Sequence, residues 1–454
     1  MLKKMALSGK SLGVLAVVVV IVAAISGYAG YSMAPRGVGV EEAYDEGYSD
    51  GFSAGRYPNG VLKVALLGPM TGALASEGEA FKLGAEWAVE EINALGGICG
   101  YKLEIVVGDT EDFEPAKVTT LMEKMINEEK VSAIFSGYGN QALIEFDVAS
   151  EYNIIYMIGA DWMAHQDKWA ENPEKYKTSF NLVPSYMPYR WHFPVTFDKW
   201  VREGKIEIIN KKVAIVYSDN YYSSWIAEGL RENFESLGYE ISLWEMVPFG
   251  TVTEWGPILA KIRADPPGLI INTDYIPSNE AAFVEQFLEN PTKSHFFIQY
   301  APHTPEFVEL LAGKSTGILY NSPGIGIYTA GNKPGEELLQ RAVERFGYEP
   351  PGYTFTVYTE IWMYKQACEI AQAYYGADPA NPDDWLTIAQ TLAEKTAWIG
   401  ASGPEIFDET HALDERYAIP VIYQLWEGER FTLEPDQFAN ADVRAPPWWE
   451  EGIS

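Results

Sequence analysis

"VALLGPMTGALASEGEAFKLGAEWAVEEINALGGICGYKLEIVVGDTE", residues 64–111, decides the fold. It places a long amphipathic run between two short apolar runs, "VALLG" and "KLEIVVG", with glycines at the junctions. Short apolar runs predict buried strands, whereas a long run with apolar residues three or four positions apart predicts a helix. Strands that follow each other through a helix pair in parallel, so the stretch predicts one unit of an α/β fold.

The same alternation extends along most of the chain. It continues to residue 137, breaks at "NLVPSYMPY" (181–189), restarts with "KKVAIVYSD" (211–219) and reaches "SHFFIQYAP" (294–302). A later segment adds "YTFTVYTEIWMYKQACEIAQAYYG" (353–376), which predicts a long helix, and "RYAIPVIYQLWEGERF" (416–431), which predicts a strand pair. The order predicts two Rossmann-like α/β lobes with parallel sheets.

Composition excludes several classes of function. The 454 residues carry 64 acidic against 33 basic side chains, a formal net charge of −31, which would repel phosphate backbones and anionic lipids. No nucleic-acid partner is therefore expected. The two cysteines, Cys99 and Cys368, exclude a disulfide scaffold but allow a single bridge. The five histidines are scattered singly, so neither a metal site nor a cofactor is predicted.

The N-terminal segment predicts export. Lys3, Lys4 and Lys10 precede an uncharged run from residue 11 to 35 that is long enough to span a bilayer. Residues 1–34 are therefore predicted to be a signal or anchor segment, either uncleaved or cleaved after Ala29. "AYDEGYSDGFSAGR" (43–56) has aromatic and glycine residues four apart, but its interior glycines disfavour a helix, so residues 35–60 are predicted to be a linker. The expected location is the periplasm or the extracellular face of the cell membrane, with the N-terminal helix as a tether.

The loops after the predicted strands contain the candidate ligand groups. In open parallel sheets, ligands bind at the carboxyl ends of the strands. The loops are "GPMTGALASEG" (68–78), "SGYGNQA" (136–142), "IGADW" (158–162), "YSDNYYSSW" (217–225), "NTDYIPSN" (272–279) and "IQYAPHTPE" (298–306). They combine hydroxyl, amide and aromatic side chains with little positive charge. This mixture predicts a small neutral or zwitterionic ligand and disfavours a phosphate.

Residues 64–111 also resemble the opening of type I periplasmic binding proteins of the leucine/isoleucine/valine class. These proteins are the substrate-binding subunits of ABC importers. The "GP-x-TG", the helix "G-x-x-x-AVEEINA-x-GGI-x-G" and the closing aspartate carry the likeness, which extends more thinly over residues 61–433. The resemblance implies two lobes joined by three hinge crossovers. It divides the chain into lobe 1 (61–184 and 326–412), lobe 2 (185–325 and 413–436) and a tail (437–454).

The resemblance also implies which residues line the ligand cleft. Lobe 1 would contribute Ser136, Tyr138, Asn140, Gln141, Ala160, Asp161 and Trp162, and lobe 2 would contribute Tyr221, Tyr222, Asp274, Tyr275 and Gln299. Only one of the two adjacent tyrosines is expected to face the cleft, and the resemblance implies Tyr222, which matches the family's "Y-G" position. The chain departs from the family pattern at "GYGNQ" and at "DW", which leaves the identity of the solute open. Asp161 would suit an amine or amide donor, and the aromatic residues would suit a flat or apolar side chain.

The function that the resemblance implies is solute capture without chemistry. We expect a branched-chain or related amino acid, or an amide-like solute, to be bound and handed to a membrane permease. One alternative is an extracellular sensor with the same bilobed fold. Another is an NAD-binding oxidoreductase, since "SGYGNQA" fits a degenerate G-x-G-x-x-A and Asp161 follows Gly139 by 22 residues. The position of this match after the third strand of its lobe, rather than the first, disfavours that alternative.

Overall fold

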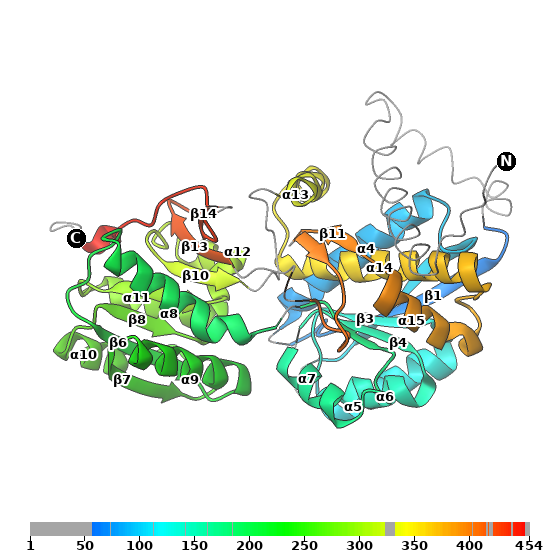
Figure 1. Cartoon of the computed structure of the whole chain (residues 1–454), viewed down its shortest axis with the longest axis horizontal. Helices are drawn as coiled ribbons and strands as arrows, with labels where there is room; N and C mark the ends of the chain where they lie inside the picture. The colour runs from blue at the N-terminus through cyan, green and yellow to red at the C-terminus, as the bar shows by residue number, and fades with distance from the viewer. Residues whose placement is uncertain are drawn as a thin grey trace, which may run out of the picture.

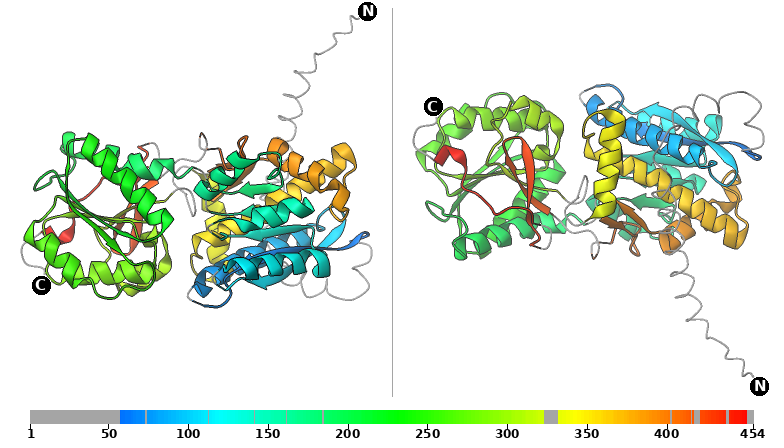
Figure 2. Two further views of the ribbon diagram at one scale, coloured as in Figure 1. Left: turned by 90° about the horizontal axis from the view of Figure 1, so that it is seen from below. Right: turned by 90° about the horizontal axis from the view of Figure 1, so that it is seen from above.

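Two α/β lobes lie side by side in the computed structural model, each built around its own sheet (Figure 1). Two further views also show the lobes as separate bodies (Figure 2). The structure describes residues 57–449, apart from 73, 112, 141, 161, 184, 323–331, 402, 415, 417–420 and 437–438. Within these residues the predicted fold class is confirmed.

The first lobe holds a five-stranded parallel sheet in the order β2-β1-β3-β4-β5. Its strands are β1 (Gly60–Gly68), β2 (Tyr101–Asp109), β3 (Ala133–Ser136), β4 (Ile155–Ile158) and β5 (Ser179–Asn181). Helices α4 (Ala75–Ala94) and α14 (Gly352–Tyr375) cover one face of the sheet, and α5 (Pro115–Lys124) and α6 (Ile144–Tyr152) cover the other (Figure 1). The lobe also contains α7 (Trp162–Glu171), α13 (Lys333–Phe346), α15 (Trp385–Lys395) and the hairpin β11 (Trp398–Gly400) and β12 (Gly403–Glu405).

The second lobe holds a seven-stranded sheet in the order β14-β13-β10-β9-β8-β6-β7. Strands β6 (Lys212–Ser218), β7 (Glu240–Val247), β8 (Leu269–Asn272), β9 (His295–Gln299) and β10 (Leu319–Ser322) run parallel. The late hairpin, β13 (Val421–Trp426) and β14 (Glu429–Glu434), adds two antiparallel strands at the edge. The helices are α8 (Met187–Arg202), α9 (Tyr221–Ser236), α10 (Gly256–Ala264), α11 (Pro277–Leu288) and α12 (Pro305–Leu310).

The chain passes between the lobes three times: between β5 and α8, between β10 and α13, and between β12 and β13. This is the number of crossovers that the family resemblance implies. The late segment that contains α14 thus returns to the first lobe and completes its core.

Helix α8 begins where the alternation of the sequence breaks, and it contains a proline, Pro194. A proline within a helix removes one backbone donor and leaves the carbonyl four residues earlier without its partner, at a cost of about 3 kcal/mol. In this protein the carbonyl of Arg190 accepts a hydrogen bond from the side-chain amide of Asn233 on α9, at 3.1 Å. Tertiary packing therefore supplies the partner that the local sequence lacks.

The two cysteines are free and buried. The single disulfide that the composition allows is thus not formed, and burial raises the pKa of the Cys99 thiol to about 12. Among residues 57–449, as far as the structure describes them, no helix has the length and apolar character to cross a bilayer. The predicted anchor (1–34) and most of the predicted linker lie outside the described residues.

Candidate ligand-binding site

Four aromatic rings gather at the carboxyl edge of the first sheet. Tyr138, which follows β3, lies with its ring centre 5.1 Å from that of Phe81, 5.2 Å from Phe113 and 5.4 Å from Tyr353. The backbone of the loop at 136–142 packs directly on the Phe81 ring. A Cβ added to Gly137 would lie only 2.2 Å from an atom of that ring. Only glycine permits this approach, and it fixes the position of the tyrosine that follows.

A second group of rings gathers at the carboxyl edge of the second sheet. The ring centre of Tyr222, at the start of α9, lies 5.8 Å from Tyr186, 6.3 Å from Tyr189 and 5.4 Å from Tyr275. The side-chain amide of Gln299, at the end of β9, donates to the Tyr222 hydroxyl at 3.3 Å. We call these residues the second-lobe tyrosine cluster.

The aromatic groups of the two lobes face one another. Burial raises the pKa of Tyr353 well above its usual range, and the nearby groups that raise it further include Tyr300 and Tyr186 of the second lobe. The pKa of Tyr300 is likewise raised, first by burial and then by neighbours that include Glu77 and Tyr138 of the first lobe. Tyr300 has a backbone φ of 64°, a conformation that is rare outside glycine and concentrates at functional sites. The two sets of rings therefore lie close to one another across the two lobes, and the space between them is the candidate ligand cleft.

Carboxylates accompany the rings. Glu77, near the start of α4, has its pKa raised to about 7, by burial and then by the charge of Glu306 on α12 of the other lobe. Burial also raises the pKa of Asp274, which accepts hydrogen bonds from Ser218 (3.2 Å) and Asn279 (2.7 Å). The site is thus acidic and aromatic.

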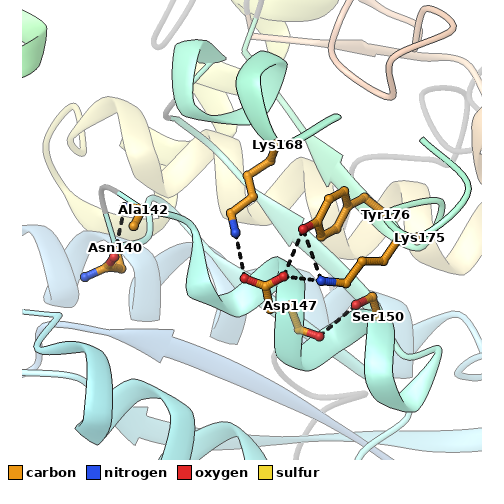
Figure 3. Close-up of polar contacts among 7 residues, drawn as sticks. All are labelled: Asn140, Ala142, Asp147, Ser150, Lys168, Lys175 and Tyr176. Atoms are coloured by element: carbon orange, nitrogen blue, oxygen red, sulfur yellow. Dashed lines mark hydrogen bonds and ion pairs between the residues drawn. The ribbon is translucent and has the colours of Figure 1, made fainter. Parts of the chain in front are cut away.

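A network of ion pairs lies beside the two strand-end loops at 136–142 and 158–162 (Figure 3). Asp147 on α6 binds Lys168 on α7 at 2.6 Å, and it also contacts Lys175 and the Tyr176 hydroxyl, the latter at 2.9 Å. Although burial alone would raise the pKa of Asp147, hydrogen bonds from these three groups hold it at about 2. The network therefore links α6 to α7, and these two helices begin at or within two residues of the ends of the loops at 136–142 and 158–162.

Several residues predicted in the first lobe stabilise the loop itself. The buried hydroxyl of Ser136 donates to the carbonyl of Tyr138 at 2.6 Å. Asn140 accepts from the backbone of Ala142 (2.9 Å) and donates to the carbonyl of Phe113 (2.7 Å). Ala160 is buried directly after β4, and Trp162 begins α7. Gln141 and Asp161 lie outside the described residues.

Some of the residues predicted in the second lobe lie in the tyrosine cluster, and the others lie outside it. Tyr222, Tyr275 and Gln299 come together in the second-lobe tyrosine cluster. Tyr221 is 53% exposed and has no place in this cluster. Asp274 is fully buried beneath the cluster and is bonded within its own turn. Ligand contact by any of these residues stays a prediction.

The sequence did not single out a further set of residues that lie in or beside the two groups of rings: Glu77, Phe81, Phe113, Tyr186, Tyr189, Tyr300, Glu306 and Tyr353. Glu77, Tyr300 and Glu306 lie in loops that the carboxyl-end rule had selected, so the rule could have found them. Tyr353, at the start of a helix in the returning segment, offers no comparable local signal.

Two lobes of parallel α/β structure, joined by three crossovers and bordering an aromatic cleft, define a bilobal solute-binding protein. The sequence matches the periplasmic binding protein family over residues 61–422. The chain belongs to this family. It is accordingly a substrate-binding protein of the ABC-transporter type and not an enzyme.

Individual proteins show the same likeness. An amino acid binding protein of Pseudomonas aeruginosa is 25% identical over 350 residues, which cover 74% of this chain and 85% of that protein. The crystal structure of a putative branched-chain amino acid ABC transporter from Silicibacter pomeroyi is 26% identical, with a TM-score of 0.75 over 86% of this chain and 100% of that one. A branched-chain amino acid transporter substrate-binding protein from Streptococcus pneumoniae, in complex with isoleucine, has the same fold at 20% identity, with a TM-score of 0.67 over 83% of this chain and 100% of that one.

Proposed function

We propose that the protein captures an amino acid or an amide-like solute between its lobes and delivers it to an ABC permease. The observation that carries the proposal is the meeting of two aromatic clusters, one from each lobe, at the carboxyl edges of both sheets. A ligand that contacts both clusters binds the closed arrangement more tightly than the open one. It therefore favours closure by its differential affinity, and the closed form is the one that a permease would recognise.

A thermal-shift screen tests this proposal. The full-length chain, in a non-ionic detergent, is heated with each of the amino acids, short amides, urea and NAD. We expect one class of small amine or amide to raise the melting temperature, because a solute that binds only the folded state stabilises it by mass action, by about 2.7 kcal/mol at a hundredfold excess over Kd. A shift with NAD alone, or with no solute of the panel, would contradict the proposal.

We further propose that residues 1–34 hold the protein at the outer surface of the membrane. Three lysines precede the uncharged run from residue 11 to 35 and one arginine, Arg36, follows it, and this excess of positive charge on the N-terminal side supports the orientation. The expected result is that the full-length protein stays in the membrane fraction after an alkaline carbonate wash, whereas a variant with Val20→Arg and Ala24→Glu is released or fails to be exported. Recovery of the unaltered protein in the soluble fraction, shortened by about the length of a signal peptide, would show cleavage instead.

A further inference from the structure

The strand-end loops of both lobes carry no positively charged side chain. The six strand-end loops of the two lobes, residues 68–78, 136–142, 158–162, 217–225, 272–279 and 298–306, contain neither lysine nor arginine. The nearest arginine on α8, Arg190, is turned toward α9, where it pairs with Glu232 at 2.9 Å and lies over the Trp225 ring at 4.5 Å. A ligand with net negative charge would therefore find no counter-ion in these six loops.

The same cleft offers two kinds of group that attract a cation. The faces of tyrosine rings carry negative electrostatic potential, and rings from both lobes border the cleft. Glu77 and Glu306 approach one another from opposite lobes closely enough for their charges to interact. Closure of the lobes on a neutral ligand would leave this repulsion in place, whereas a positive group between the carboxylates would remove it.

A buried acceptor points to the same chemistry. Gln299 is fully buried, and its amide nitrogen is bonded to Tyr222, but its carbonyl oxygen Oε1 has no partner among the described residues. An unsatisfied buried acceptor costs about 1–3 kcal/mol, which a ligand N–H group would recover. An ammonium ion supplies such a donor and a positive charge together.

Resting on the proposed function above, we propose that the solute is a small organic cation, whose ammonium group lies among the tyrosine rings of both lobes and beside Glu77. Protonated amines and quaternary ammonium ions both meet this description, and the experiment separates the two. A carboxylate on the solute is not required.

Calorimetric titration of the full-length chain, in a non-ionic detergent, tests this inference. The probes are choline, butylammonium, isoleucine and 3,3-dimethylbutan-1-ol, which has the shape of choline without its charge. We expect at least one of the two cations to bind about tenfold more tightly than the uncharged alcohol, since a desolvated cation–π contact contributes up to about 2 kcal/mol. Preference for butylammonium would identify an N–H donor to Gln299, and preference for choline would identify a ring-lined quaternary site.

The Glu77→Gln variant removes the charge of Glu77 and keeps the size of its side chain. This change should weaken binding of the preferred cation about fivefold and leave the uncharged alcohol unaffected, because only the Coulomb attraction is removed. Glu79→Gln, two residues further along α4 on an exposed side chain, is the matched control and should have no effect.

The pH dependence provides an independent readout. With its pKa raised to about 7 by burial and by Glu306, Glu77 is mostly protonated at pH 6 and mostly ionised at pH 8. The groups that face it are Glu306 and the phenols of Tyr300 and Tyr353, and the pKa of each phenol is raised well above its usual range. Cation affinity should therefore rise from pH 6 to pH 8 in the unaltered protein and stay level in Glu77→Gln.

The outcomes distinguish the inference from the proposed function. If neither cation binds more tightly than the uncharged alcohol, the inference is overturned. If isoleucine alone binds, the inference is also overturned but solute capture stands. If no probe binds and the wider solute screen is silent as well, both fall.

Discussion

Gly84→Ala should lower the stability of the protein by about 3 kcal/mol, the upper end of what overpacking a tight contact usually costs. Gly84 lies on α4 where that helix crosses α14, and a Cβ there would fall 2.1 Å from the carbonyl oxygen of Thr354. The obstacle is backbone, so it cannot rotate away as a side chain would. The helices are also joined at this point by the Thr354 hydroxyl, which donates to the carbonyl of Ala80 at 3.1 Å. A single methyl group must therefore push apart two helices that build the core of the first lobe.

The measurement is thermal unfolding followed by circular dichroism, where 3 kcal/mol corresponds to a fall of roughly 6–12 °C. Gly256→Ala is the matched control, because a Cβ at Gly256 meets no heavy atom within 4 Å and its backbone is not in the left-handed region. This control should leave the melting temperature unchanged or raise it slightly. Equal melting temperatures for the two variants would show that α4 and α14 do not pack as closely as described.

Much of the fold could be predicted because its determinants are local. "VALLG" and "VSAIF" are continuous apolar runs, and strands β1 and β3 are correspondingly buried in the middle of the sheet. The late hairpin could also be predicted, because two apolar runs flank a short turn. Glu427 and Gly428 form this turn, and both have a positive φ. Helix α8 could not be predicted from its own sequence. The hydrogen bond that compensates for Pro194 comes from Asn233, a residue in another helix.

The candidate site could be predicted at the level of loops but not of side chains. The rule that ligands bind at strand ends selected the loops that contain Tyr138, Tyr222, Tyr275 and Tyr300. It could not tell that Asn140 would bond to Phe113 and hold the loop instead of facing the cleft. That outcome depends on contacts between segments distant in sequence.

The composition of the cleft likewise depends on long-range arrangement. Tyr186 comes from the first crossover, Tyr300 from the end of β9 and Tyr353 from the returning segment. Each occurs in a different sequence context, and no periodicity or spacing relates them. Only the two-lobe topology brings them together, so the aromatic character of the cleft becomes apparent only in three dimensions.

Tyr222→Ala should weaken binding of the solute identified in the thermal-shift screen tenfold or more. The ring of Tyr222 contacts three other tyrosines of the second-lobe cluster, and its hydroxyl accepts the hydrogen bond from Gln299. Truncation removes a ring that is predicted to face the ligand, and the loss of such an aromatic contact costs about 1 kcal/mol or more. Calorimetric titration well below the melting temperature measures the effect on affinity separately from any effect on folding.

The neighbouring tyrosine provides the control that decides the assignment. Tyr221 has the same chemistry, the same helix and the adjacent position, but its side chain is 53% exposed outside the cluster. Tyr221→Ala should therefore change affinity less than twofold, whereas Tyr222→Phe, which keeps the ring and loses the hydroxyl, should fall between the two alanine variants. Because adjacent helical residues point in directions about 100° apart, one of the two tyrosines can face the cleft while the other faces solvent. A larger loss at Tyr221 than at Tyr222 would place the ligand on the other side of α9 and overturn the site.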